Sequence, residues 1–284
     1  MPHPLLDCTA IDRPPEQFLR AAGDLFAEFG APTQDSGNRS FGVRVAGERF
    51  FVKTAGAPGD THPPLAHAER VALLRNAARL HASFSHPLLP PLLRLIESPE
   101  GPLLVYPWVT GELLYAAQAE RDSPSSAAMR FRRLPAATIC RCLDALYGLH
   151  EQLARAGWVA VDFYDGCLIY DFAADRLAVV DLDMYHQGPF ENTRGRMFGS
   201  ARFMAPEEFA LGAWIDERTS VFVLGRAALL FLADGARAAA AFRGPSACFA
   251  VASRATEPDR ARRFSSVAEF VAAWRSARAE TADG

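Results

Sequence analysis

The sequence predicts a mixed α+β fold in which a small β-rich part precedes a larger helical part. Two observations predict this order. Short runs of β-branched and aromatic residues lie mostly in the first part, whereas apolar residues at helical spacing dominate the second. The chain has 284 residues and half are hydrophobic, enough for one large domain or two closely packed lobes. We expect a helical extension over 1–30, a β-rich lobe over 31–107 and a helical lobe over 108–284.

In the first part, the sequence pattern predicts a helix, a hairpin, a second helix and two further strands. Apolar residues of 15–29 recur at helical spacing, so we expect one amphipathic helix there. The turn residues Ala46-Gly47 separate two strand-like runs and indicate a hairpin, and residues 54–64 are rich in loop-forming residues. The remaining runs are a helix over 65–83 and two strands within 90–109, around a Pro-Glu-Gly turn.

The second part predicts a long helix near 134–156 and then three short strands. The strand-like runs are VAVDF, GCLIYDF and RLAVVDLDMY. A stretch without periodicity follows over 186–208, and from 216 onward the pattern is mainly helical. This succession continues the predicted α+β order.

Composition excludes several classes of protein. The net charge of -3 gives no basic face for nucleic acid, and no apolar run approaches the roughly 20 residues of a membrane helix. The N-terminal residues carry acids and prolines where a signal peptide carries basic and then apolar residues. Five cysteines show neither CxxC spacing nor a paired histidine cluster, which disfavours disulfides and structural zinc. We therefore expect a cytoplasmic protein without nucleic-acid or membrane partners.

A single lysine, Lys53, occurs among the 30 basic residues. Every other one is arginine, which suggests a composition that replaces lysine wherever chemistry permits. A compact ammonium and a planar guanidinium serve different sites. Because Lys53 ends an apolar strand pattern, we favour a functional role over chance survival on the surface.

Ordered motifs from about residue 36 to 270 give the chain a resemblance to a known family. They are Gly37 to Val43, FVK ending at Lys53, Glu69, SHPLLPPLL, LLVYPWVTGELL, Asp162, Asp181-Leu182-Asp183, GSARFMAPEE, TSVFVLG and Pro258 to Ser265. In this order the chain resembles the eukaryotic-type serine/threonine protein kinases. The resemblance implies a bilobal kinase fold that binds ATP and Mg²⁺, for which Mn²⁺ can substitute.

For the first part, the resemblance implies a nucleotide site. Lys53 would contact the α- and β-phosphates, and Glu69 would hold its ammonium, although a solvated helix glutamate is the alternative. The segment Gly37, Asn38, Gly42 and Val43 would cover the phosphates, or else form a plain hairpin turn. It has lost one of the three usual glycines. At the hinge, the resemblance places three further residues against the adenine: Tyr106, Pro107 and Val109.

For the second part, the resemblance implies a catalytic base and a metal site. Asp162 would orient the substrate hydroxyl, and Asp181 would bind Mg²⁺. Cys167 stands where the family has an asparagine ligand, and a thiol is a poor ligand for Mg²⁺. Either Asp165 or Asp183 supplies the missing oxygen, or the site uses one metal, or activity is low. The alternative is that VAVDFYDG is merely a strand and turn.

Two substitutions affect one bracing network of the family. Val161 replaces the arginine that couples to a phosphorylated loop, and Ser220 replaces a buried aspartate that braces the catalytic loop. We expect an apolar substitute for this network and activation without an arginine–phosphate clamp. Thr193 and Ser200 remain candidate phosphosites, although Ser200 fits better as a contact of Asp162.

The first expectation for function is phosphoryl transfer from ATP to serine or threonine hydroxyls of a protein substrate. Two alternatives stay open. A pseudokinase would bind nucleotide or act as a scaffold, which Cys167, Val161 and Tyr164 favour. A small-molecule phosphotransferase would lack the GSARFMAPEE segment, which here resembles the end of a protein kinase activation loop. The resemblance also implies a structural pair between Glu207 and Arg263.

Overall fold

The computed structural model describes residues 2–30, 36–60, 64–121 and 123–280, so part of the predicted loop 54–64 lies outside the described residues. The described chain is a mixed α+β protein with an antiparallel five-stranded sheet and seven α-helices, which confirms the predicted class. It divides into two compact units, and the boundary between them in the sequence follows Val109. Within the described ranges, none of the helices has both the length and the apolar composition that crossing a membrane requires.

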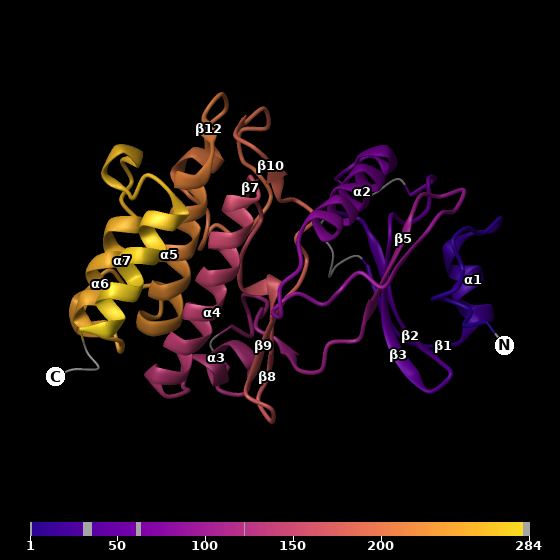
Figure 1. The fold of residues 1–284 in the computed structure, drawn as a ribbon, viewed down its shortest axis with the longest axis horizontal. Helices are drawn as coiled ribbons and strands as arrows, with labels where there is room; N and C mark the ends of the chain where they lie inside the picture. The colour runs from indigo at the N-terminus through magenta and orange to yellow at the C-terminus, as the bar shows by residue number, and fades with distance from the viewer. Residues whose placement is uncertain (1, 31–35, 61–63, 122, 281–284) are drawn as a thin grey trace. The chain divides into compact units, whose positions relative to one another are not determined.

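The first unit is built on the sheet β1-β2-β3-β5-β4, in which every neighbouring pair is antiparallel (Figure 1). Its elements are α1 (Pro15–Ala22), β1 (Asp24–Phe29), β2 (Arg39–Val45), β3 (Glu48–Thr54), α2 (His67–Ser83), β4 (Arg94–Ile96) and β5 (Leu103–Pro107). The hairpin between β2 and β3 and the helix α2 lie where the sequence predicted them.

Each face of this sheet packs against a different part of the unit. Alternate residues of β2 and β3, including Val43 and Val52, join Leu5 and Leu19 of the N-terminal segment in one core. On the other face, Ala55 and Leu104 pack against Leu74 of α2. Because side chains alternate along a strand, Lys53 lies on the face that carries α2 and Val43 on the opposite face.

The prediction of one helix over 15–29 is wrong beyond Ala22. The helix α1 ends at Gly23, which is extended, and residues 24–29 form the edge strand β1. A Cβ atom at Gly23 would lie 2.2 Å from the carbonyl oxygen of Arg44, so the chain crosses β2 too closely for a helix to continue. Phe26 and Phe29 fit helical spacing, but strand pairing with a bulge after Leu25 overrides that local pattern.

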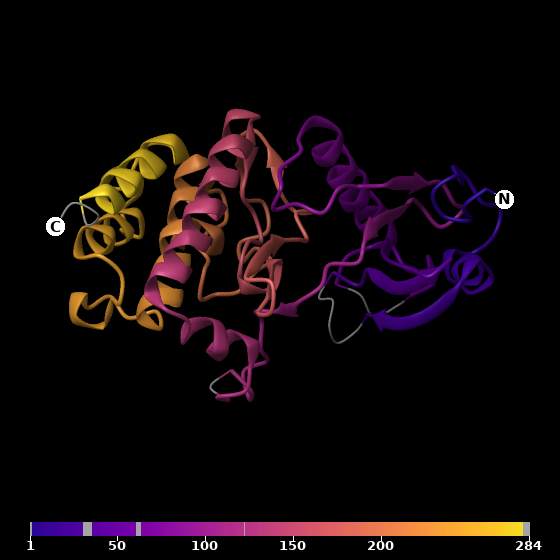
Figure 2. The same ribbon diagram turned by 60° about the horizontal axis from the view of Figure 1, so that its bottom comes forward.

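The second unit is mainly helical. Its helices are α3 (Ala127–Arg132), α4 (Ala136–Arg155), α5 (Glu217–Ala233), α6 (Ser246–Ala255) and α7 (Val267–Ala279). The helix α5 packs against α4, α6 and α7 (Figures 1 and 2), and 14 of its 17 residues are buried, which explains its nearly continuous apolar sequence. The Tyr147 hydroxyl on α4 donates to the Leu224 carbonyl on α5 at 3.0 Å.

Short strands of the second unit position its loops. The strands β6 (Glu112–Leu113), β8 (Leu168–Asp171) and β9 (Arg176–Val179) form a three-stranded sheet. Two further pairs join β7 (Trp158–Val159) to β10 (His186–Gln187) and β11 (Phe190–Glu191) to β12 (Trp214–Ile215). Of the predicted strand VAVDF only Val159 lies in a strand, at the end of β7, and Asp162 lies in the loop that follows.

The turn between β2 and β3 provides a test of the fold. Ala46 and Gly47 have φ of 52° and 86°, so a non-glycine residue occupies the left-handed region. Asparagine tolerates this region better than alanine. We expect Ala46→Asn to raise the free energy of unfolding by about 0.5–1 kcal/mol in urea titrations. Ala46→Val, the matched control, should lower it, and a stabilising valine would contradict this account of the turn.

Candidate functional site

Four aspartates of the second unit, Asp162, Asp175, Asp181 and Asp234, have positive φ, and two of them belong to the predicted site. Asp162 follows β7 with φ of 59°, and Asp181 follows β9 with φ of 61°. Left-handed geometry is unfavourable for residues other than glycine and costs about 1–3 kcal/mol at each such position. Such strain persists where surrounding contacts enforce it, and it is concentrated at functional sites. These two residues are the ones that the sequence analysis assigned to catalysis and metal binding.

The thiol of Cys167 connects these two aspartates. Cys167 ends the short 3₁₀ helix Asp165–Cys167 and is almost fully buried. Its Sγ lies 3.4 Å from the Asp162 carbonyl oxygen and 3.9 Å from the Asp181 carbonyl oxygen. The N–H of Val180 donates to the Cys167 carbonyl at 2.8 Å, so the backbone also holds β9 against this turn. The structure therefore brings Asp162 and Asp181 together and directs the thiol toward backbone carbonyls.

Asp165 is occupied by an ion pair. Its Oδ2 accepts a hydrogen bond from Nη2 of Arg202, and only 3 % of its side chain is exposed. Burial raises the pKa of the Asp165 carboxyl above its usual value, and the Arg202 charge and hydrogen bond oppose that rise. Arg202 engages only Oδ2, and the buried Oδ1 has no hydrogen-bond partner among the described residues, so the role of Asp165 as a metal ligand stays a prediction.

Asp181 and Asp183 remain the predicted candidates for binding a metal ion. Asp183 is buried and lies two residues beyond Asp181, at the start of a turn in which the Tyr185 N–H donates to the Leu182 carbonyl at 3.2 Å. Within the described ranges, no group of three or more His, Cys, Asp or Glu residues could hold a metal ion by itself. Mg²⁺ in nucleotide sites is commonly held by one or two carboxylates, with phosphates and water completing its shell.

A buried histidine and tyrosine support the turn after Asp183. His150 on α4 has Nε2 at 2.8 Å from the Tyr185 hydroxyl and Nδ1 at 2.9 Å from the Leu146 carbonyl. Since a carbonyl only accepts, Nδ1 donates to Leu146 and Nε2 accepts from Tyr185. Burial raises the pKa of Tyr185 well above its usual value, which keeps the phenol protonated as the donor. This pair could not be predicted from the sequence, because its partners lie 35 residues apart.

The bracing network of the catalytic loop is partly polar, contrary to expectation. Ser220 on α5 accepts a hydrogen bond from the Ala160 N–H at 2.9 Å, so a hydroxyl oxygen supports the chain two residues before Asp162. The Val161 side is apolar, as predicted, and packs in a cluster with Met197 and Met204. The expectation that an apolar substitute serves the whole network is therefore wrong for Ser220, which still presents an oxygen to the loop.

The segment that contains GSARFMAPEE lies against Asp162. Gly199 has φ of 123°, and a Cβ atom built on it would lie 3.3 Å from Oδ1 of Asp162. The Arg196 Nη2 donates to the Gly199 carbonyl at 3.3 Å. Gly199 therefore permits both an unusual backbone conformation and a close approach to the carboxylate.

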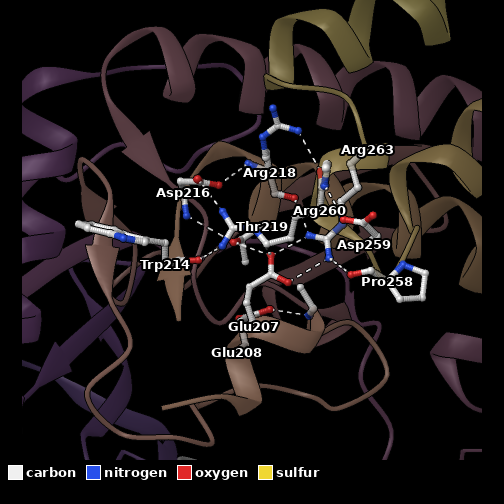
Figure 3. Close-up of polar contacts among 12 residues, drawn as sticks. Glu207, Glu208, Trp214, Asp216, Arg218, Thr219, Pro258, Asp259, Arg260 and Arg263 are labelled. Carbon is white, nitrogen blue, oxygen red and sulfur yellow. Dashed lines mark hydrogen bonds and ion pairs between the residues drawn. The ribbon is translucent and has the colours of Figure 1, made fainter. Parts of the chain in front are cut away.

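Glu207 and Arg263 form a buried ion pair with two hydrogen bonds, 2.7 and 3.0 Å long (Figure 3). The Thr219 hydroxyl donates to the same carboxylate at 2.9 Å. Burial alone would raise the pKa of Glu207, but hydrogen bonding and the charge of Arg263 outweigh it and lower the pKa. Arg263 also donates to the Glu257, Arg218 and Pro258 carbonyls. The pair joins the end of the segment to α5 and the chain before α7.

In the first unit, Lys53 is buried on β3, between Ser40 of β2 and Leu104 of β5. On the same face, Tyr106 packs in the cluster beside α2, with its ring centroid 5.2 Å from that of His81. Pro107 pairs with Phe50 at the end of β5, and Val109 is the last residue of the unit. These positions leave Lys53 and the predicted hinge on one sheet.

The helix α2 presents two neighbouring charges in different ways. Glu69 is exposed, and its Oε2 accepts a hydrogen bond from the Ala66 N–H at 2.9 Å, which caps the helix. Arg70 is fully buried and donates to the Gly37 carbonyl at 2.7 Å and the Ala57 carbonyl at 3.0 Å. The predicted pairing of Lys53 with Glu69 stays a prediction. Arg70, which holds the start of the glycine segment, was missed because only tertiary structure buries it.

The glycine segment leaves less space for phosphate groups at Gly42 than the resemblance implies. Gly37 has φ of 85° and Asn38 is buried, but a Cβ atom at Gly42 would lie 2.8 Å from the Phe26 ring and 2.9 Å from the Trp108 ring. Gly42 thus permits aromatic packing on the Lys53 face. Val43 belongs to the core on the opposite face, so its side chain is not available to a ligand beside Lys53.

Comparison with known proteins assigns no family: no protein-family model matches the chain, and no curated protein matches it. The candidate site therefore rests on the residues and on their geometry. Asp162, Cys167 and Asp181 come together within the second unit, whereas Lys53 and Tyr106 belong to the first. Their convergence around one nucleotide remains a prediction.

A pH dependence follows from Glu208, which is buried beside Glu207 and accepts from the Ala205 N–H at 2.7 Å. Burial raises its pKa to about 7, against a usual 4.5. The folded protein then keeps a proton that the unfolded chain loses, so stability falls as pH rises from 4.5 to 7. Glu208→Gln should remove up to about 3 kcal/mol of this decline in urea unfolding measured between pH 4.5 and 8.

The exposed Glu191→Gln is the matched control for the loss of one carboxylate, and its pH profile should run parallel to that of the unaltered protein. Parallel profiles for Glu208→Gln and the unaltered protein would contradict the assignment of the decline to Glu208.

Proposed function

We propose that the chain is a bilobal protein-kinase-like enzyme that transfers the γ-phosphoryl group of ATP to serine or threonine hydroxyls of protein substrates. The observation that carries the proposal is the arrangement of Asp162, Cys167 and Asp181. Two strained aspartates from separate loops share one buried thiol, and an aperiodic segment approaches the first of them through Gly199. An ordinary strand and turn would not require this combination.

The proposed roles follow from charge and chemistry. Asp162 accepts or orients the substrate hydroxyl through a carboxylate that the backbone at Gly199 approaches closely. Asp181, with Asp183, holds Mg²⁺, which would supply charge neutralisation to the phosphates when bound. Lys53 provides an ammonium for the α- and β-phosphates. Its burial on β3 would strengthen that contact relative to water.

The sheet of the first unit supports a kinase-like N-terminal lobe. Three antiparallel strands are followed by the helix α2 and two further strands, with Lys53 on the third strand and on the face that carries α2. This order is what the resemblance implies for a lobe that covers a nucleotide. The two-lobe arrangement itself is part of the proposal.

A protein substrate is favoured over a small molecule by the segment over 186–208. Its end is fixed by the buried pair of Glu207 and Arg263, and its middle lies at Asp162. A rigid segment beside the proposed base provides backbone against which an extended peptide can align. We therefore place the small-molecule phosphotransferase behind the protein kinase.

A pseudokinase is the second candidate, and two observations favour it. The Phe26 and Trp108 rings occupy the space beside Gly42, which limits how closely this glycine could approach a phosphate. The Cys167 thiol contacts two carbonyls, so it does not replace the oxygen ligand of the family's asparagine. Such a protein would bind nucleotide weakly or serve as a scaffold.

Transfer from labelled ATP tests the proposal directly. With Mg²⁺ or Mn²⁺ and a generic protein substrate, we expect label on serine or threonine, reduced at least about 100-fold in Lys53→Met and in Asp181→Asn. The exposed Arg254→Gln, remote from these residues in sequence, is the control and should retain transfer. Stabilisation by ATP without transfer would support the pseudokinase, and label only on a small molecule would support the third candidate.

The metal requirement gives a second test. Cys167→Asn introduces an amide whose nitrogen can donate to the Asp162 and Asp181 carbonyls while its oxygen can bind a cation. We expect the Mg²⁺ concentration for half-maximal transfer to fall about three- to tenfold. Cys167→Ser, which keeps a small donor, is the matched control and should leave that concentration unchanged. An unchanged Mg²⁺ dependence in Cys167→Asn would count against an unfilled ligand position at residue 167.

A further inference from the structure

An ion pair joins the catalytic loop to the GSARFMAPEE segment. Nη2 of Arg202 donates to Oδ2 of Asp165, which lies three residues after Asp162 in the 3₁₀ helix that ends at Cys167. The side chains are 20 % and 3 % exposed, so the contact is largely shielded from solvent. An ion pair in such surroundings is screened far less by salt than one on the surface.

Arg202 is held at this position from two further sides. Its carbonyl accepts a hydrogen bond from Nε of Arg226 on α5 at 2.8 Å. The next residue, Phe203, is fully buried, with its ring edge-on to those of Phe163 and Phe231. The guanidinium is therefore directed at Asp165 by a fixed backbone, and the loss of Asp165 would leave a mostly buried charge without its carboxylate.

The rest of the segment is also held by apolar packing and backbone hydrogen bonds. Met197 and Met204 pack with Val161, and the Met197 N–H donates to the Glu208 carbonyl at 2.9 Å. Val161 occupies the position from which the resemblance would expect an arginine to bind a phosphorylated residue. An aliphatic side chain cannot bind a phosphate, so order in this segment must come from another source.

We propose that Asp165 and Arg202 are positioning residues, and that their ion pair orders the segment against Asp162 without phosphorylation. The inference rests on the proposed function for its effect on catalysis, since an ordered segment is what would align the substrate hydroxyl. It goes beyond the proposed function in assigning a constitutively ordered site to this chain. Gly199 lies three residues before Arg202, so an ion pair that holds Arg202 also restricts the position of Gly199.

Hydrogen–deuterium exchange of the full chain, combined with transfer kinetics, tests the proposal. The variants are Arg202→Gln, Asp165→Asn and the double variant, with the exposed Arg254→Gln as the matched arginine control. The backbone amides of residues 196–204 should exchange at least tenfold faster in all three variants than in the unaltered protein. In the control variant their exchange rates should not change. The double variant should exchange no faster than either single variant, because all three remove the same contact.

For catalysis, kcat should fall at least tenfold in the three variants while the KM for ATP stays within twofold. A merely structural role would instead lower both the thermal midpoint and exchange protection throughout α4 and α5. Phosphatase treatment, and substitution of the exposed Thr193→Ala, should leave exchange and transfer unchanged.

Unchanged exchange over 196–204 in Arg202→Gln would overturn the proposal, and so would additive effects in the double variant. Faster exchange after phosphatase treatment would show that a phosphate orders the segment, which also contradicts it. If the unaltered protein transfers no phosphate, the proposed function fails, yet the exchange data still decide whether the pair orders the segment.

Discussion

The burial of α5 is the constraint on which the second unit depends. A helix enclosed on all sides must satisfy every polar group that it carries into the core, since an unpaired one is costly there. The side chains of Thr219, Ser220 and Arg226 do this by binding Glu207, the Ala160 N–H and the Arg202 carbonyl. Each partner belongs to a segment that shapes the candidate site, so the core of the unit and the geometry of its loops have a common cause.

This arrangement explains how strained loops can persist. Asp162 and Asp181 keep left-handed backbones because Ser220, Cys167 and the strand β9 fix the chain around them. These contacts act on backbone groups of Ala160, Asp162 and Asp181. The neighbouring residues Glu207 and Glu208 also differ. Glu207 pairs with Arg263 inside the unit, whereas burial raises the pKa of Glu208 to about 7.

The first unit follows a different principle. Neither of its described helices, α1 and α2, is enclosed on all sides. The two faces of its sheet differ, with Val43 in a core against the N-terminal segment and Lys53 on the face of α2. Arg70 is the buried polar group that matters there, since it joins the turn at Gly37 to the loop at Ala57. Aromatic packing against Gly42 makes this face more closed than an open phosphate-binding loop would be.

Long periodic segments were predictable because their patterns repeat over several turns or alternate along a strand. The helices α2, α4, α5 and α7 and the hairpin at Ala46-Gly47 lie where the sequence indicates, and so does the α+β class. The strand at 24–29 could not be predicted, because its residues fit helical spacing and only pairing with β2 decides their conformation.

Some residues of the candidate site were likewise predictable from the sequence, whereas their contacts were not. Lys53 could be singled out from sequence as the single lysine, and Asp162 and Asp181 by the motifs that resemble a known family. Only the tertiary structure decides that Asp165 pairs with Arg202, that Cys167 faces two carbonyls and that Ser220 supports the loop. These contacts join residues as far as 60 positions apart, and no local pattern records which partner a buried polar group will find.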